Sequence, residues 1–146
     1  MLVIDQATRD AIVDHARREH PEECCGVVAG PEGSQRPERF VPMVNAARSA
    51  TFYEFDSMDL LKLYREMDAR GEEPIVIYHS HTATEAYPSR TDVTYASEPG
   101  AHYVLVSIRE PDAVEFRSFH IVDGVVAEEE VRVVATLESE PTVTAD

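Results

Sequence analysis

Two histidines and an aspartate in the stretch YHSHTATEAYPSRTD, residues 78–92, have the types and the spacing of metal ligands. His79 and His81 follow the apolar, β-branched run PIVIY, which predicts a buried strand. In a strand, residues i and i+2 lie on the same face about 6.6 Å apart, so both imidazoles can point at one ion. A catalytic zinc site needs a third ligand, a nearby His, Asp or Glu, and leaves one position open for water.

Asp92 is the best candidate for that third ligand. Ser89 and Asp92 form the pattern Ser-x-x-Asp, which predicts a helix with Ser89 as its N-cap and Asp92 in its first turn. A carboxylate held there can face back toward the end of the strand. Each half of the pattern also has a plainer interpretation, because His-x-His alone is weak evidence of a metal and Ser-x-x-Asp is more often only a capping box.

Two helices are predicted away from this stretch. Residues 5–20 carry apolar side chains at helical spacing, with Asp5 as the cap and Pro21 as the stop. Residues 57–71 form the second helix and end at a glycine. Its inward face is expected to consist of Leu60, Leu61, Tyr64 and Met67.

Strands are predicted in the remaining apolar segments. Pro42 indicates an edge or a bulge, Asp123-Gly124 predicts a hairpin turn, and the acidic run 128–130 is interpreted as a solvated strand end. Interleaved helices and strands followed by a meander predict an α/β fold, a single three-layer domain in which helices flank a mixed, mainly antiparallel sheet. The extended segments are residues 24–30, 38–46, 51–56, 74–81, 102–109, 113–122 and 125–134.

The composition limits the partners and the compartment. The 146 residues carry a formal charge of -15, which argues against nucleic acid and anionic membranes because both attract basic patches. The two cysteines, Cys24 and Cys25, are adjacent and cannot form a disulfide framework. With no signal peptide or membrane span in the sequence, we expect a cytoplasmic protein with its domain in residues 1–135 and a C-terminal tail in 136–146.

The chemistry-bearing residues together resemble a known motif. His-Ser-His, seven intervening residues and Ser-x-x-Asp are similar to the JAMM motif of the MPN+ metallopeptidases, which adds a glutamate on a strand after the first helix. In HPEECCGVVAG, Glu23 stands at that position, and the resemblance covers about residues 4–134. Thr82 replaces a proline found in most members, a loop-shaping residue and not a ligand. In this the loop resembles that of the Mec branch of bacterial peptidases, which act on the sulfur carrier CysO.

The resemblance implies a role for each residue. His79, His81 and Asp92 would hold one Zn²⁺ ion, which lowers the pKa of water to about 7. Glu23 would accept the water proton as general base and return it to the departing amine. Ser89 would donate a hydrogen bond to the oxyanion of the tetrahedral intermediate, or it is only a helix cap.

The other polar residues have structural interpretations. Only one of the neighbours Glu22 and Glu23 can face the metal if the chain is extended there. Ser80 points away from both histidines and is interpreted as structural, and the cysteines as strand packing. The histidines without metal-like spacing to the site are expected to be surface or satisfied core residues: His15, His20, His102 and His120.

The resemblance implies a substrate and leaves alternatives open. The expected reaction is hydrolysis of the amide bond at the C-terminal glycine of a ubiquitin-like sulfur carrier protein with a Gly-Gly tail, which releases cysteine for cysteine biosynthesis. The tail is expected to add to a sheet edge at residues 50–55. The alternatives are an isopeptidase that removes ubiquitin-like modifiers from lysines and a non-catalytic MPN scaffold. The His-x-Glu and Pro-Cys-x-x-Cys motifs of a deaminase are missing, and a homodimer is left open.

Overall fold

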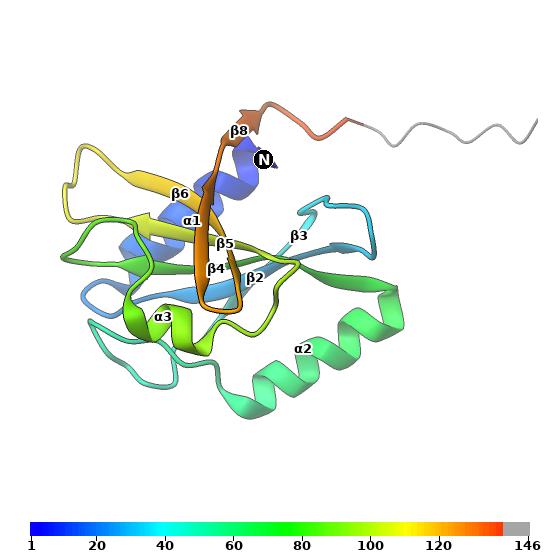
Figure 1. The fold of residues 1–146 in the computed structure, drawn as a ribbon, viewed down its shortest axis with the longest axis horizontal. Helices are drawn as coiled ribbons and strands as arrows, with labels where there is room; N and C mark the ends of the chain where they lie inside the picture. The colour runs from blue at the N-terminus through cyan, green and yellow to red at the C-terminus, as the bar shows by residue number, and fades with distance from the viewer. Residues whose placement is uncertain (139–146) are drawn as a thin grey trace, which may run out of the picture.

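A mixed β-sheet with helices on both faces forms the protein (Figure 1), and the computed structural model describes residues 1–138. The predicted α/β fold is thereby confirmed, while residues 139–146 of the expected tail lie outside the described part. None of the helices in that part is long and apolar enough to cross a membrane. The helices are α1 (Gln6–Glu19), α2 (Ser57–Arg70) and α3 (Arg90–Tyr95). The strands are β1 (Leu2–Asp5), β2 (Cys25–Pro31), β3 (Arg39–Met43), β4 (Glu72–His81), β5 (His102–Ser107), β6 (Glu115–Val122), β7 (Val125–Glu129) and β8 (Val131–Val134).

The strand that carries the two histidines lies inside the sheet. The order is β3-β2-β4-β5-β6-β7, with β4 and β5 parallel and the other neighbours antiparallel. His79 lies opposite Cys25 on one side and Leu105 on the other, so neighbouring strands hold its backbone from both sides. Pro42 lies in the edge strand β3, where its missing N–H is tolerated.

The two faces of the sheet bury separate apolar clusters. Ile12 and Ala16 of α1 pack with β1 on one face, while Leu63 and Met67 of α2 pack on the other. The predicted inward face of α2 was partly wrong. Leu61 is 45% exposed and Tyr64 36%, because α2 contacts the sheet through a single narrow stripe. The Tyr64 hydroxyl instead donates to a carboxylate oxygen of Glu98 at 2.7 Å.

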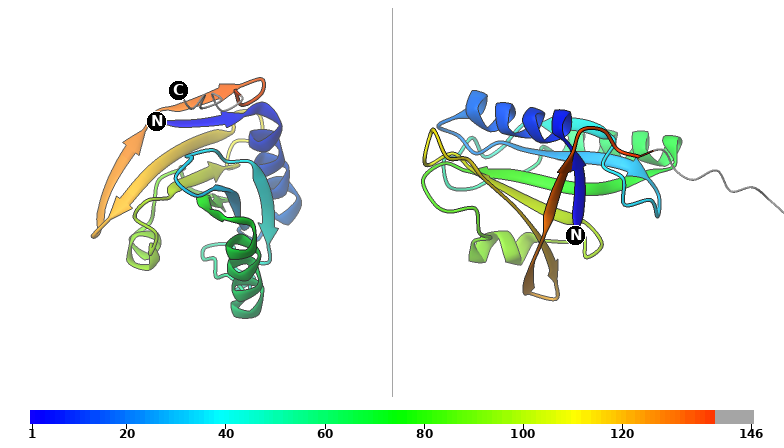
Figure 2. Two further views of the ribbon diagram at one scale, coloured as in Figure 1. Left: turned by 90° about the vertical axis from the view of Figure 1, so that its right-hand side faces the viewer. Right: turned by 90° about the horizontal axis from the view of Figure 1, so that it is seen from above.

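The last predicted strand is divided between two sheets. Residues 125–134 form β7 and β8, and β8 leaves the large sheet to pair in parallel with β1 (Figure 2). Glu130 lies between them, and its carbonyl oxygen accepts from Leu2 N at 2.8 Å. The expectation of a solvated acidic end was wrong for Glu129, whose side chain is only 7% exposed, because it contacts His102 of β5 and Ser118 of β6.

The segment 50–55 is not the edge strand that was expected. Within the described chain its only ladder contact is an isolated bridge between Asn45 and Phe55. An asparagine side chain replaces strand pairing: Asn45 Nδ2 donates to the carbonyl oxygens of Glu23 and Phe52, each at 3.0 Å. One amide therefore joins this segment to the end of the loop that leads into β2.

Candidate metal centre

The end of β4 brings two imidazoles to one carboxylate. His79 and His81 lie on the same face, as the strand period requires, and both are buried. The Nε2 atom of each ring is 3.1 Å from Asp92 Oδ2, although His79 Nε2 lacks the alignment of a hydrogen bond. The three side chains that were predicted to bind the ion are thus brought together, with all ligand atoms within 4.8 Å of one another.

The first turn of α3 positions the carboxylate. Ser89 N donates to Asp92 Oδ2 at 2.8 Å and Asp92 N donates to Ser89 Oγ at 3.1 Å, which completes the predicted capping box. Burial alone would raise the pKa of Asp92, but the adjacent His79 and His81 rings and the hydrogen bond from Ser89 N hold it well below its usual range. The carboxylate is therefore ionised and rigidly placed.

The hydrogen bonds of His81 leave a lone pair facing Asp92. His81 Nδ1 is 2.8 Å from the Glu85 carbonyl oxygen, which can only accept, so Nδ1 carries the hydrogen. In the neutral ring Nε2 then faces a carboxylate oxygen with a lone pair, so either a proton or a metal ion bridges the two atoms. Burial opposes charge on His81, but Asp92 and the Glu85 carbonyl raise its pKa overall. This donor set fits a zinc ion, because metal-binding histidines usually donate their other N–H to a carbonyl or carboxylate oxygen.

Glu23 is a buried carboxyl group beside this cluster. Its backbone is fixed by donation from Glu23 N to the Ser49 carbonyl oxygen at 2.8 Å, and the residue is 4% exposed. Its Oε1 finds no hydrogen-bond partner among the described residues. Burial raises the pKa of Glu23 to about 7, with smaller opposing effects from His81 and Asp92. Such a group can take and release a proton near neutral pH, whereas its neighbour Glu22 is partly exposed.

The other nearby polar residues have structural contacts. Ser80 Oγ accepts from Cys24 N at 2.8 Å on the far side of β4, which confirms its structural interpretation. Burial raises the pKa of the Cys24 and Cys25 thiols to about 12, so neither is a thiolate at neutral pH. The Ser89 hydroxyl is exposed and accepts the capping hydrogen bond, which leaves its own proton free to be donated.

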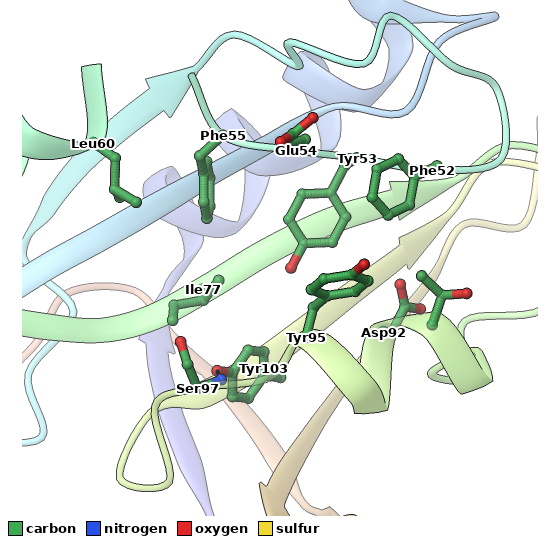
Figure 3. Close-up of a pocket in the computed structure, with 11 residues that line it drawn as sticks. Phe52, Tyr53, Glu54, Phe55, Leu60, Ile77, Asp92, Tyr95, Ser97 and Tyr103 are labelled. Atoms are coloured by element: carbon green, nitrogen blue, oxygen red, sulfur yellow. Dashed lines mark hydrogen bonds between the residues drawn. The ribbon is translucent and has the colours of Figure 1, made fainter. Parts of the chain in front are cut away.

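An aromatic pocket opens beside the carboxylate. It encloses about 450 Å³ between the segment 52–55 on one side and Asp92 and Tyr95 of α3 on the other, with Ile77 of β4 at its floor (Figure 3). The Tyr53 ring stacks on His79 with 4.3 Å between ring centroids and 24° between planes. This stacking fixes the plane of an imidazole whose Nδ1 has no hydrogen-bond partner within residues 1–138.

Two histidines that were interpreted as unrelated residues form a second cluster. His102 and His120 both contact Glu129, which sequence reasoning missed. The signal was available in the hairpin. Its Asp123-Gly124 turn pairs Ser118 with Glu129, and His120, two residues after Ser118 in the strand, lies on the same face. By contrast, the Nδ1 of His15 lies 2.7 Å from the Tyr78 hydroxyl inside the core, and His20 is exposed, as expected.

Comparison with known proteins establishes the family. The chain belongs to the prokaryotic homologs of the JAB domain, which match residues 5–122. It is 63% identical to the CysO-cysteine peptidase of Mycobacterium tuberculosis over 134 residues, 92% of each chain. It is 34% identical to the desampylase of Haloferax volcanii over 104 residues, 68% of this chain and 75% of that protein. The solution structure of DSY2949 from Desulfitobacterium hafniense has a TM-score of 0.82 and 30% identity, with 94% and 96% of the two chains covered. The resemblance inferred from the motif is therefore confirmed.

Proposed function

We propose that this protein is a zinc-dependent peptidase that hydrolyses the amide bond at the C-terminal glycine of a ubiquitin-like sulfur carrier and releases cysteine. The convergence of His79, His81 and Asp92 beside the buried Glu23 carboxyl group carries the proposal. The 63% identity to a CysO-cysteine peptidase supports the choice of substrate. The two free, buried thiols fit a reducing cytoplasm, and fractionation of cells would test that location.

Three side chains near the metal ligands are each assigned a role in this reaction. The bound metal would supply Lewis acidity that lowers the pKa of water from about 15.7 to about 7. Glu23 takes the proton of the attacking water and passes it to the nitrogen of the departing cysteine, which its pKa of about 7 favours. Ser89 donates its hydroxyl proton to the developing oxyanion, and Tyr53 holds the ring of His79 in plane.

The proton transfer is tested by a pair of neighbouring substitutions. We expect Glu23→Gln to slow release of cysteine from a carrier-cysteine adduct by about 10²–10⁴-fold, because the amide cannot accept the proton. Glu22→Gln is the matched control and should retain activity. Mass spectrometry of the adduct measures both, and a chelator should stop the wild-type reaction until Zn²⁺ is added. Full activity of Glu23→Gln, or of chelated enzyme, would contradict the proposal.

The aromatic pocket is proposed to receive the carrier tail near the scissile bond. Phe52 and Tyr95 face one another at the pocket with 6.1 Å between ring centroids. The two rings are in edge-to-face contact, so an extended tail with small glycine residues next to the reacting bond would lie across them. We expect Phe52→Ala to raise KM for the carrier adduct severalfold with little change in kcat, since it removes binding surface and leaves the metal ligands intact. An unchanged KM would show that the tail binds elsewhere.

A second candidate substrate is a lysine-linked conjugate of a ubiquitin-like modifier. The 34% identity to a desampylase favours it. Incubation of the same enzyme sample with the cysteine adduct and with a lysine isopeptide of the same carrier separates the two. We expect the cysteine adduct to have the larger kcat/KM.

A further inference from the structure

The second histidine cluster is separated from the proposed zinc site by the sheet itself. His81 lies opposite Ser107 at the end of β5, while His102 begins that strand, about 16 Å away at the rise of a strand. Alternation along β5 also places His102 on the face of Val104, which belongs to the α1-side core. The metal ligands His79 and His81 lie on the opposite face.

The geometry of this cluster repeats that of the first. His102 Nδ1 is 2.7 Å and His120 Nε2 is 3.0 Å from the same atom, Glu129 Oε2, and the two ring centroids are 4.9 Å apart. The ligand atoms all lie within 4.8 Å of one another. The Ser118 hydroxyl also approaches Oε2 at 3.1 Å, so three polar groups converge on a single carboxylate oxygen.

The contact of His102 Nε2 with Gln35 leaves the other ring nitrogen, Nδ1, available to bind a cation. His102 Nε2 lies 2.7 Å from Gln35 Oε1, an amide oxygen that can only accept, so Nε2 carries the hydrogen. In the neutral ring Nδ1 then has a lone pair that faces a carboxylate oxygen. At 2.7 Å the two atoms are bridged either by a proton or by a metal ion, which is also the situation at His81 and Asp92.

Burial and charge favour a cation at this position. The side chains of His102 and Glu129 are 4% and 7% exposed, and a carboxylate so removed from water needs positive charge nearby. The Met1 amino group lies 2.9 Å from the other oxygen, Oε1, which leaves Oε2 to the imidazoles. His120 is 37% exposed and provides the route by which an ion can enter.

We propose that His102, His120 and Glu129 form a second binding site for a divalent metal ion of the zinc class, which links β5, β6 and β7. Two imidazole nitrogens and one carboxylate oxygen suit zinc and leave a fourth position for water. Ligands of a tetrahedral zinc ion lie about 3.3 Å apart, given metal–ligand distances of about 2.0–2.1 Å. The present 2.7 and 3.0 Å would widen by a small withdrawal of the Glu129 carboxylate as the metal replaces a bridging proton.

The zinc content of variants tests the site without reference to activity. Full-length protein is saturated with Zn²⁺, freed of excess metal and measured by native mass spectrometry. We expect two ions per wild-type chain, one in His120→Ala and one in Glu129→Gln. His20→Ala is the matched control, since His20 is exposed and belongs to neither cluster, and it should retain two. The proposal is supported if His120→Ala lowers the zinc content by one ion, whatever the wild-type total, and is overturned if the content is unchanged.

Thermal unfolding gives an independent reading when the first site is disabled. In a His81→Ala background, zinc at about a hundred times its dissociation constant should raise Tm by about 5–10 °C through the second site alone. Addition of His120→Ala should abolish that rise. A zinc-dependent rise that persists in the double variant would overturn the proposal. His120→Ala alone should release cysteine at the wild-type rate, so a failure here is distinguishable from a failure of the proposed peptidase.

Discussion

Glu23 is the residue on which both the proposed chemistry and the stability of the metal-free chain depend. Its carboxyl group is buried, with one oxygen unpaired among the described residues. A core carboxylate without a partner is costly, because water is lost and nothing replaces it. The raised pKa is the visible result of that cost, and the same feature makes the group a competent base.

The cost of the charged form predicts how stability depends on pH. The pKa of Glu23 is raised from 4.5 to about 7, so the folded metal-free chain binds a proton more tightly than the unfolded chain. This contribution to stability is fully present below pH 4.5 and is lost as pH rises through 7. We therefore expect Glu23→Gln, in chelator, to raise the free energy of unfolding at pH 8 by up to about 3 kcal/mol relative to wild type.

Urea denaturation at two pH values measures this effect. The difference between Glu23→Gln and wild type should be small at pH 4, where both side chains are uncharged. Glu22→Gln serves as the control and should change stability by less than about 0.5 kcal/mol at either pH. A gain of the same size at pH 4 and pH 8 would mean that charge is not the cause.

At the level of single residues, the site residues that lie close together in the sequence could be predicted from local patterns, whereas distant ones could not. His79, His81 and Asp92 lie within fourteen residues, and the periods of a strand and a helix turn are enough to bring them together. Glu23 lies far upstream, and only the family resemblance identified it. Glu129 was misread because its acidic neighbours suggested solvent, whereas the partners that bury it come from β5 and β6.

At the level of elements, the close approach of β2 and β4 supports the end of β4. Gly26 of β2 lies opposite Tyr78, and the Tyr78 ring crosses it so closely that an added Cβ would lie 2.2 Å from the hydroxyl oxygen. Tyr78 is fully buried and stacks on Phe40 with 5.9 Å between ring centroids. The Tyr78 ring, which immediately precedes His79 in the chain, is thus held in a single position by Gly26 and Phe40.

We expect Gly26→Ala to destabilise the protein by about 1–3 kcal/mol, because the new methyl group must displace this ring. Gly100→Ala is the matched control, since nothing lies within 4 Å of its added Cβ, and it should change stability little. Chemical denaturation measures both. Equal stabilities for the two variants would show that the Tyr78 ring moves aside freely.

Elements differed in how far local sequence determines them. The Asp5 cap of α1 and the Gly71 end of α2 formed as predicted, because capping involves neighbours in the chain. The division of residues 125–134 into β7 and β8 was missed. A continuous β-branched pattern contains no information on which of two sheets will accept each half.

For the whole molecule, the small sheet of β1 and β8 joins the first strand to the last one described. Ile4 and Val133 are direct partners in its register, yet Ile4 is 0% exposed and Val133 39%. Substitutions at these two positions can therefore distinguish the contribution of core burial to stability from the contribution of strand pairing. The core on the α1 side is complete only when β1 covers it.

We expect Ile4→Ala to lower the free energy of unfolding by about 2–5 kcal/mol, as for other large side chains removed from a core. Val133→Ala should cost well under half as much, because the side chain is smaller and 39% of the residue stays exposed to water in the folded chain. Urea denaturation of the two variants compares them directly. Similar losses would indicate that pairing between β1 and β8, and not core packing, holds the first strand in place.

The side chains proposed to bind the ion come from β4 and the first turn of α3, whereas much of the pocket wall comes from the irregular segment 52–55. The ligand residues and the residues of the pocket wall can therefore evolve independently of each other. Substitutions can accumulate in the wall, where no ladder of strand hydrogen bonds has to be preserved, while the three proposed metal ligands stay unchanged. Proteins with this fold can therefore change their substrate specificity while they keep the same catalytic chemistry.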